Sequence, residues 1–301
     1  MKKILPLAVL LAVFFLPAAS RADQSGYTVI TKPYRLLNNP ANNAQPIALR
    51  MDIYLPEPFD YNKQYAGVLY VCGSGWLMPS LTLNKGVDRW SAHGIELAKR
   101  GYVSFAISYR GSPLFFYPAP NEDAQYALDL ITGQENPEFI EQFCRPLKDV
   151  ALVGSSSGGN IAALMGTGRA GNNREHVRCI AVYAAPMDMR QSAFLPPQSR
   201  LAVALSYLPF QDAATYAEAS PLCNVDQAFC PFLLQMGRGD SLLPVSQFDM
   251  MQDALQQQAI VVEKHIYSNS THGFQFRKSK NAEIALHTTV DFISRYLPQP
   301  E

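Results

Sequence analysis

The sequence predicts an α/β fold in which a mostly parallel, doubly wound sheet is covered by helices on both faces. Short apolar runs alternate with longer segments of helical pattern over most of the 301 residues. The runs are almost continuously hydrophobic, as strands are when helices cover both faces of a parallel sheet. Strands that alternate with helices in a chain of this length favour one large α/β domain.

The predicted elements follow in order along the chain. Tyr27–Leu37 and Ile47–Leu55 read as strands with no helix between them, so we expect an antiparallel start to the sheet. Further strands are expected at Ala66–Cys72, Tyr102–Tyr109, Val150–Gly154, Ile180–Ala185, Pro231–Met236 and Ile260–Tyr267. Helices are expected at Arg89–Arg100, Asn121–Ile131, Ser157–Gly168, Val245–Gln258 and Ala282–Tyr296.

One long connection breaks this alternation. The residues from Pro186 to Pro221 separate two strands, with short helices expected at Leu201–Tyr207 and Ala213–Ala219. A connection of this length is usually functional or a small subdomain. We interpret it as a small helical lid over the carboxyl ends of the strands, where α/β sheets bind ligands.

The first 22 residues predict a signal peptide. Lys2 and Lys3 precede an apolar run, and Ser20 and Ala22 place small residues before a predicted cleavage site. The run is shorter than the ~20 residues that a spanning helix needs, so an uncleaved membrane anchor is the less favoured alternative. We expect an exported protein, periplasmic or secreted, with one folded domain over residues 23–301 and no membrane span after cleavage.

The charges give no reason to expect a nucleic-acid partner. The chain carries 25 basic and 25 acidic residues, and three of the basic ones (Lys2, Lys3 and Arg21) lie in the predicted signal peptide. No basic patch or charge run follows. The five cysteines suggest disulfides in an oxidising compartment. Cys223 and Cys230 bracket a short polar loop and are the favoured pair, Cys144 and Cys179 are a second candidate pair, and Cys72 is left over.

A sharp turn is predicted around Ser156. VALVGSSSGGN, Val150–Asn160, contains G-x-S-x-G, a pattern expected by chance in about one chain of this length in ten. Its context is more specific, because an apolar strand enters it and a helical run leaves it. Ser156 is therefore the candidate nucleophile and Ser155 a turn residue, while the backbone N–H of Ser157, rather than its hydroxyl, points at a developing oxyanion. A phosphate-binding loop is the alternative, but the loop has no Lys.

A serine nucleophile needs a base and a group that orients that base. His272 stands in the polar loop SNSTHGF after the last strand, whereas His93 lies within a helix and is expected at the surface or behind the site. Asp240 follows the strand PFLLQM, so the chain order is Ser, Asp, His, and its carboxylate can fix the tautomer of the imidazole. Asp226 and Asp249 are weaker candidates for the acid, and a helix cap is the alternative role of Asp240.

Small residues in CGSGW, after the strand AGVLYVC, predict an oxyanion hole. The backbone amides of Ser74 and Gly75, with that of Ser157, are the expected donors. Each such donor lowers a reaction barrier by about 2.7–4 kcal/mol. A plain glycine-rich turn is the alternative. An apolar substrate cleft is expected from Trp76, Met78 and Tyr109, together with Phe194, Tyr207 and Phe210 of the lid, although these side chains could equally belong to the core.

Together these motifs resemble the α/β-hydrolase superfamily, in particular its carboxylesterases of the hormone-sensitive-lipase and feruloyl-esterase-like branches. Those enzymes carry an H-G-G-G/A-W-type loop, a G-D-S-A-G-G-N-type elbow, a G-x-x-D turn and a late His-Gly. The corresponding stretches here are CGSGW, GSSSGGN, GRGD and THGF, and MDIYLP is similar to their second-strand motif. Tyr109-Arg110 and NEDAQYAL also match, which implies a buried pair of Arg110 and Asp123 that supports the site. A surface ion pair is the alternative.

The chain departs from the family pattern around the oxyanion loop. Cys72 replaces a histidine that is expected to brace this loop by hydrogen bonding, and a thiol is a weaker partner. Ser74 replaces a glycine, and Ser155 replaces an acid before the nucleophile. None of these changes removes a member of the catalytic triad, but they leave open a lower activity or a different acyl pocket.

The resemblance implies an exported serine carboxylesterase for small to medium esters, which acts through an acyl-enzyme on Ser156 and requires no metal or cofactor. A serine peptidase of the same superfamily is one alternative, but the chain has no room for the extra domain such enzymes usually carry. A non-catalytic hydrolase-fold binding protein is another, although it would normally have lost a triad member. The natural ester and the oligomeric state do not follow from the sequence.

Overall fold

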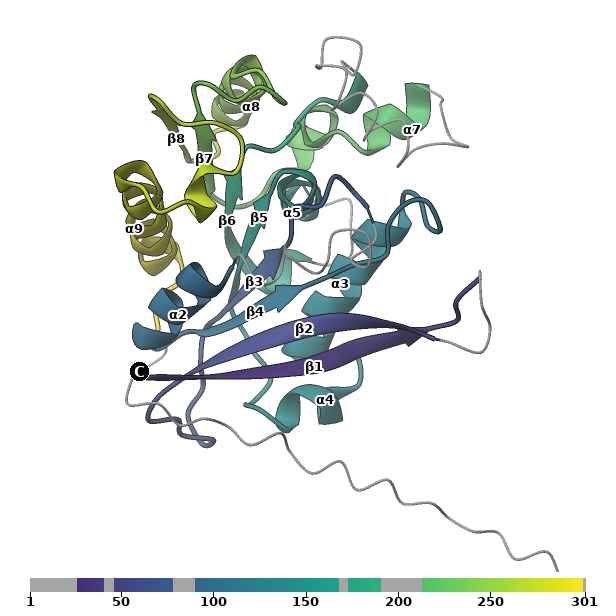
Figure 1. Ribbon diagram of the computed structural model, residues 1–301, viewed down its shortest axis with the longest axis vertical. Coiled ribbons are helices and arrows are strands. Elements are labelled where there is room, and N and C mark those ends of the chain that lie inside the picture. The colour runs from purple at the N-terminus through teal and green to yellow at the C-terminus, as the bar shows by residue number, and fades with distance from the viewer. Residues whose placement is uncertain (1–25, 41–45, 78–89, 168–172, 191–212, 300–301) are drawn as a thin grey trace, which may run out of the picture.

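The computed structural model describes residues 26–40, 46–77, 90–167, 173–190 and 213–299. Within these ranges one eight-stranded sheet has the order β1-β2-β4-β3-β5-β6-β7-β8 (Figure 1). Its strands are β1 (Tyr27–Leu37), β2 (Ile47–Pro56), β3 (Gly67–Val71), β4 (Val103–Ile107), β5 (Val150–Ser155), β6 (Val177–Tyr183), β7 (Phe232–Gly237) and β8 (Val262–Tyr267). Every strand expected from the sequence is present.

The sheet is antiparallel at one end and parallel elsewhere, as predicted. β1 pairs with β2, and β2 with β4, in antiparallel register. The five remaining neighbour pairs are parallel. After β3 the chain builds β4 on one side and then returns to build β5 on the other side of β3. This reversal is a topological switch point, and it places the loops that follow β3 and β5 next to each other at the carboxyl edge.

Helices cover both faces of the sheet (Figure 1). Those in the described ranges are α2 (Ser91–Lys99), α3 (Ala119–Thr132), α4 (Pro137–Glu141), α5 (Ser157–Gly166), α7 (Ala213–Glu218), α8 (Ser246–Gln257) and α9 (Lys280–Tyr296), with short 3-10 turns η1 (Asn173–Glu175), η3 (Pro221–Gln227) and η4 (Phe274–Phe276). Residues from α3, α5 and α8 share one core cluster, and residues from α2 and α9 share the other. The sequence had not predicted α4, a short helix that begins at Pro137.

The core lies on the two sides of the central strands. Along β5, Val150 and Leu152 belong to the α3/α5/α8 cluster, while Ala151 and Val153 belong to the α2/α9 cluster. All residues of β3, β4 and β5 are buried. Burial on both faces explains why these strands read as unbroken apolar runs in the sequence.

His93 is buried, which excludes the surface, the first of the two places expected for it. Only 1% of its surface is exposed, and its ring stacks on Trp90 at 4.6 Å between centroids. Its Nε2 lies 3.1 Å from the hydroxyl of Tyr183. Burial lowers the pKa of His93 to about 3, because desolvation disfavours the charged ring. His93 lies on the face of α2 that packs against the core, so its position in the helix places a polar side chain among buried residues.

The structure contains neither of the predicted disulfides, because none of the five cysteines, all of which lie in the described ranges, is bonded to another. Cys144 packs in the α3/α5/α8 cluster and Cys179 in the α2/α9 cluster, so the sheet separates them. Cys230 is buried just before β7, whereas Cys223 lies on η3 and is only partly buried. The two thiols of the favoured pair therefore lie in different surroundings.

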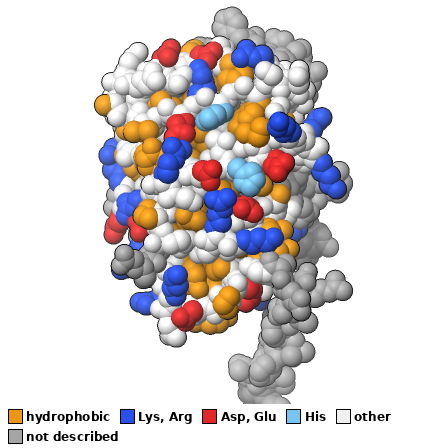
Figure 2. Space-filling view, turned by 90° about the vertical axis from the view of Figure 1, so that its left-hand side faces the viewer, with side chains coloured by type: hydrophobic (Ala, Val, Ile, Leu, Met, Phe, Trp, Pro, Cys, Tyr) orange, Lys and Arg blue, Asp and Glu red, His pale blue; other side chains and the backbone are white. Residues whose placement is uncertain are grey.

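The surface over α2 and α9 mixes charges of both signs. Figure 2 shows basic and acidic side chains interspersed on this face, with no large area of one sign. Among the helices described, none combines the length and apolar character needed to cross a bilayer. The predicted signal peptide lies outside the described residues.

The predicted lid is only partly within the described ranges. α7 corresponds to the helix expected at Ala213–Ala219. The helix expected at Leu201–Tyr207, the three lid aromatics and Met78 lie outside the described residues.

Candidate active site

Ser156 occupies a tight turn between β5 and α5. Its backbone has φ 52° and ψ −124°, a positive φ that is costly for a residue with a side chain. Glycines make the turn possible, because the backbone passes too close to its neighbours there to leave room for a side chain. A Cβ on Gly158 would lie 2.1 Å from the carbonyl oxygen of Val71, and a Cβ on Gly154 would lie 2.3 Å from the carbonyl oxygen of Gly158. The glycines of G-x-S-x-G are thus sterically required, and the strain presents Ser156 at the carboxyl edge.

Ser156, His272 and Asp240 form a continuous hydrogen-bonded series. Nε2 of His272 lies 3.1 Å from Oγ of Ser156, and Nδ1 lies 2.8 Å from Oδ2 of Asp240. The side chain of Asp240 is fully buried, while that of His272 is 22% exposed. The structure therefore brings together the three residues predicted as a triad, although serine and histidine are 116 positions apart.

The turn after β7 fixes the carboxylate of Asp240. Its Oδ1 accepts hydrogen bonds from the backbone N–H groups of Leu242 (2.8 Å) and Leu243 (3.0 Å), which leaves Oδ2 for the histidine. These contacts form a turn and not the helix cap that the sequence offered as an alternative, because α8 begins at Ser246 and its N-cap residue is Val245. The amide of Gly239 donates to the carbonyl of Ser270 at 2.9 Å and ties the acid turn to the histidine loop. The rival Asp249 instead pairs with Lys264 at 2.5 Å.

The loop that carries His272 is anchored by its neighbours. Gly273 adopts φ 71°, and the amide of Phe274 donates to the carbonyl of Thr271 at 3.2 Å. Phe274 is buried and its ring lies 4.9 Å from that of Tyr267. An anchored apolar side chain two residues beyond the imidazole limits how far the loop can shift.

The loop after β3 lies directly against the elbow. A Cβ on Gly73 would lie 2.6 Å from the carbonyl oxygen of Ser155 and 3.0 Å from Cβ of Ser156. The two predicted oxyanion donors follow. In this structure the amides of Ser74 and Gly75 both donate to Oγ of Ser157, at 3.0 and 2.9 Å. The sequence had assigned a role only to the backbone of Ser157 and so missed its hydroxyl.

Tyr109 joins the same loop through its hydroxyl. Its Oη lies 2.9 Å from Oγ of Ser157 and 2.9 Å from Oγ of Ser74. Burial raises the pKa of Tyr109 to about 12. Trp76, like Tyr109, is almost completely buried and packs in the core. Both side chains have clear packing roles, and their contact with substrate stays a prediction.

Arg110 and Asp123 form the buried pair that the resemblance implied. The Nε of Arg110 lies 2.9 Å from Oδ2 of Asp123, and the Arg110 amide donates to the same oxygen at 2.7 Å. Arg35 of β1 also contacts this carboxylate, a contact that no sequence motif indicated. Burial raises the pKa of Asp123, and its contacts with the two guanidinium groups oppose that shift. This ion cluster lies at the end of β4, where the chain leaves the site.

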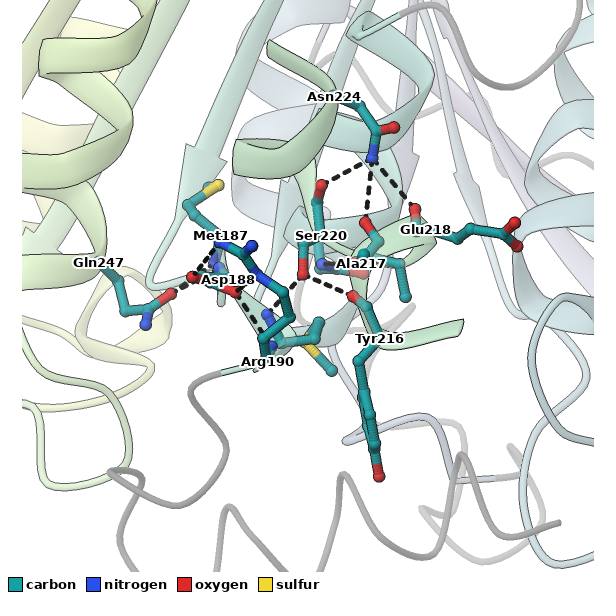
Figure 3. A network of polar contacts seen from close by, with 12 residues as sticks. Met187, Asp188, Arg190, Tyr216, Ala217, Glu218, Ser220, Asn224 and Gln247 are labelled. Atoms are coloured by element: carbon teal, nitrogen blue, oxygen red, sulfur yellow. Dashed lines mark hydrogen bonds and ion pairs between the residues drawn. The ribbon is translucent and has the colours of Figure 1, made fainter. Parts of the chain in front are cut away.

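The two ends of the predicted lid are tied to the nucleophile helix. Nδ2 of Asn160, in α5, donates to the carbonyls of Pro186 and Ala219, both at 3.0 Å. Figure 3 shows the neighbouring contacts: the Ser220 hydroxyl bridges the amide of Met189 and the carbonyl of Tyr216, and Oε1 of Gln247 accepts from two further amides. The two ends of the predicted lid, at Pro186 and Ala219, are therefore held in place relative to Ser156.

The arrangement can generate a serine nucleophile by general-base catalysis. His272 is within hydrogen-bond distance of Ser156, and Asp240 orients the imidazole. Among the residues that the structure describes, no group of three or more His, Cys, Asp or Glu could hold a metal ion. Sheet, elbow and triad order together define an α/β-hydrolase of the Ser-Asp-His type.

The comparisons with known proteins agree with this class. The fold is similar to that of Thermogutta terrifontis esterase 2 phosphonylated by sarin, with a TM-score of 0.70 and 15% identity over 90% of this chain and 96% of that chain. It is also similar to that of esterase B from Lactobacillus Rhamnosis, with a TM-score of 0.67 and 18% identity over 90% of this chain and 87% of that chain. The predicted α/β-hydrolase fold is confirmed.

The sequence profile of the BD-FAE family matches residues 51–255, from within β2 to within α8, and the chain belongs to that family. Two curated relatives are each 24% identical. One is a probable carboxylic ester hydrolase, LipM, of Mycobacterium tuberculosis, matched over 70% of this chain and 49% of that protein. The other is the kynurenine formamidase of Meyerozyma guilliermondii, matched over 78% and 90%. The chain spans about half the length of the mycobacterial relative.

Proposed function

We propose that the protein is a serine carboxylic ester hydrolase that acts on small to medium esters through an acyl-enzyme on Ser156. The observation that carries this proposal is the continuous series from Asp240 through His272 to Ser156, with distances of 2.8 and 3.1 Å. The name of the mycobacterial relative supports the same reaction class.

The reaction follows from this geometry in two acyl transfers. His272 takes the proton of Ser156 as Oγ attacks the ester carbonyl, and the backbone amides of the elbow and the β3 loop stabilise the oxyanion. His272 then protonates the leaving alcohol, and the acyl group remains on Ser156. A water molecule repeats the sequence and releases the carboxylic acid. The buried carboxylate of Asp240 stabilises the imidazolium formed in each step.

A second candidate reaction is the hydrolysis of an aryl formamide. The match to the yeast formamidase covers 90% of that protein. The same triad can attack a formamide carbonyl, so the two reactions differ in the leaving group and in the size of the acyl group. Peptide hydrolysis and substrate binding without turnover are further alternatives.

The experiment compares wild-type protein with Ser156→Ala. We expect turnover of p-nitrophenyl acetate and butyrate, a loss of about 10⁴-fold or more in the variant, and labelling of Ser156 by an organophosphonate. N-formylaniline and a peptide p-nitroanilide are assayed beside the esters. Faster turnover of the formamide would favour the second candidate. Turnover that survives Ser156→Ala would remove the catalytic assignment, and absence of both turnover and labelling would favour the binding protein.

We propose that the partner of the protein is a small-molecule ester and not a nucleic acid. We also propose that the protein is exported, with cleavage after Ala22. The export is supported by the charged start, the apolar run and the small residues of the first 22 positions. N-terminal sequencing of protein recovered from the periplasm or the medium tests this. We expect a chain that begins at Asp23, and an uncut chain retained with the cells would contradict the proposal.

A further inference from the structure

Two departures from the motifs of the resembling enzymes meet in one network. Ser74 replaces a glycine of the oxyanion loop, and Ser157 stands where the G-D-S-A-G-G-N-type elbow has alanine. The structure joins these two hydroxyls through Oη of Tyr109, at 2.9 Å from each. Cys72, which replaces the bracing histidine, lies at the start of the same loop.

The direction of each hydrogen bond in this network follows from counting lone pairs. Oγ of Ser157 has two acceptor positions, and the amides of Ser74 and Gly75 fill both. Its own proton is therefore donated to Tyr109. The proton of Tyr109 then goes to Oγ of Ser74, whose proton goes to the carbonyl of Leu77 at 3.0 Å. The chain of bonds runs one way and leaves no hydroxyl proton without an acceptor.

Burial makes this network rigid. Ser157 is 1% exposed and Tyr109 is 2% exposed. Buried polar groups that lose a partner are costly, and hydrogen bonds in a chain strengthen one another at low dielectric. The raised pKa of Tyr109 keeps its hydroxyl protonated at neutral pH, so this donor is present there.

We infer that the Ser157 hydroxyl, oriented by Tyr109, is a positioning residue that aims the amides of Ser74 and Gly75, the task for which Cys72 is a weak substitute. A neutral hydroxyl is a weaker acceptor than an oxyanion. The amides, held in place by Ser157, can therefore interact weakly with a neutral substrate carbonyl and more strongly with the oxyanion as its charge develops. Such an interaction acts on the transition state more than on substrate binding. This inference rests on the proposed ester hydrolysis.

The test is the variant Ser157→Ala, which keeps the triad and all three backbone donors. With p-nitrophenyl butyrate we expect kcat to fall roughly 10- to 100-fold and KM to change by less than about threefold, because a small misplacement of catalytic groups costs on this scale. Ser157→Thr keeps a hydroxyl and is expected to recover most of kcat. Alanine occupies this position in the family motif, so the variant is expected to fold, and a thermal melt checks this.

Two further variants separate aiming from general packing. Ser155→Ala removes the same group from the other neighbour of the nucleophile, where the hydroxyl contacts Tyr70 at 2.6 Å, and its kcat is expected to fall less than that of Ser157→Ala. Tyr109→Phe is expected to lower kcat, and the double variant with Ser157→Ala to be no slower than Ser157→Ala alone, because residues of one network are not additive.

The inference is overturned if Ser157→Ala keeps wild-type kcat, or gains activity because the hydroxyl obstructs the oxyanion. It is also overturned if threonine restores nothing or if Ser155→Ala is equally slow. If Ser157→Ala does not fold, the test is made with Tyr109→Phe, and an unchanged kcat in that variant would likewise overturn the inference. Wild-type protein that is inactive and unlabelled at Ser156 would instead refute the proposed function, so the two failures are distinguishable.

Discussion

Two fully buried carboxylates, Asp240 and Asp123, serve the site in opposite ways. Asp240 faces the imidazole of His272 at 2.8 Å, whereas Asp123 faces the guanidinium groups of Arg110 and Arg35. An imidazole can accept and release a proton during a reaction, while a guanidinium group stays protonated. In the proposed mechanism the same side chain, equally buried, is therefore part of a proton-transfer system in one place and of a fixed ion cluster in the other.

The comparison teaches that the partner, more than burial, decides what a carboxylate does. Asp240 keeps Oδ2 for a group that gains and loses a proton. Both carboxylate oxygens of Asp123 contact permanent cations, Arg110 and Arg35, and one of them also accepts a hydrogen bond from the Arg110 amide. Removing either carboxylate should thus affect different properties, activity in the first case and stability in the second.

The largest expected effect is that of Asp240→Asn on turnover. Asn can still accept hydrogen bonds from the amides of Leu242 and Leu243, but its NH₂ faces His272 and favours the wrong tautomer. We expect kcat for p-nitrophenyl butyrate to fall about 10⁴-fold, with little change in melting temperature. A loss below tenfold in a folded variant would show that another group orients the histidine.

Asp123→Asn should reverse this pattern. The substitution removes the buried anion that Arg35 and Arg110 share, although Arg110 keeps its contact with Glu122 at 2.8 Å. Breaking a buried pair costs about 3–5 kcal/mol, and we expect a loss toward the lower end of that range. Urea unfolding should show this loss, while the folded fraction keeps kcat within a few-fold of wild type. Asp249→Asn, which removes an exposed carboxylate from Lys264, is the matched control and should cost about 0–1 kcal/mol. Equal costs for the two variants would contradict the ion cluster.

His93 sharpens the comparison as a buried titratable group that faces neutral rings, those of Trp90 and Tyr183. Its pKa of about 3 lies below the 6.5 of an ordinary histidine. The unfolded chain binds a proton below pH 6.5, while the folded protein does not until about pH 3. This residue therefore lowers stability as pH falls through that window, by up to about 1.4 kcal/mol per pH unit.

His93→Phe keeps the stacking on Trp90 and removes the titration. The free energy of unfolding, measured in urea at intervals from pH 7 to pH 4, should fall less steeply in the variant than in the wild type. Identical slopes for the variant and the wild type would mean that His93 takes up its proton over the same pH range in the folded protein as in the unfolded chain, in conflict with its burial.

The sequence was most informative where the signal was local. The apolar runs of β3 to β7, the glycines around Ser156 and the loop positions of Asp240 and His272 all depend on neighbours in the chain. Contacts between distant segments were missed: Arg35 reaches Asp123 from 88 positions away, and Oγ of Ser157 meets amides 82 and 83 positions away.

The cysteines and His93 show a different limit. Whether a thiol pairs depends on which side of the sheet it faces, and whether a histidine titrates depends on which side of its helix faces the core. The spacing of cysteines in the sequence does not show which side of the sheet each thiol faces. One polar residue in a short amphipathic helix does not show whether its side of the helix faces the core. The structure settles both through packing.

Asn160 ties both ends of the long connection, Pro186 and Ala219, to the helix that follows Ser156. A substitution elsewhere in the described part of that connection is therefore expected to leave the position of Ser156 unchanged, whereas loss of the Asn160 amide would let the two ends move independently of it.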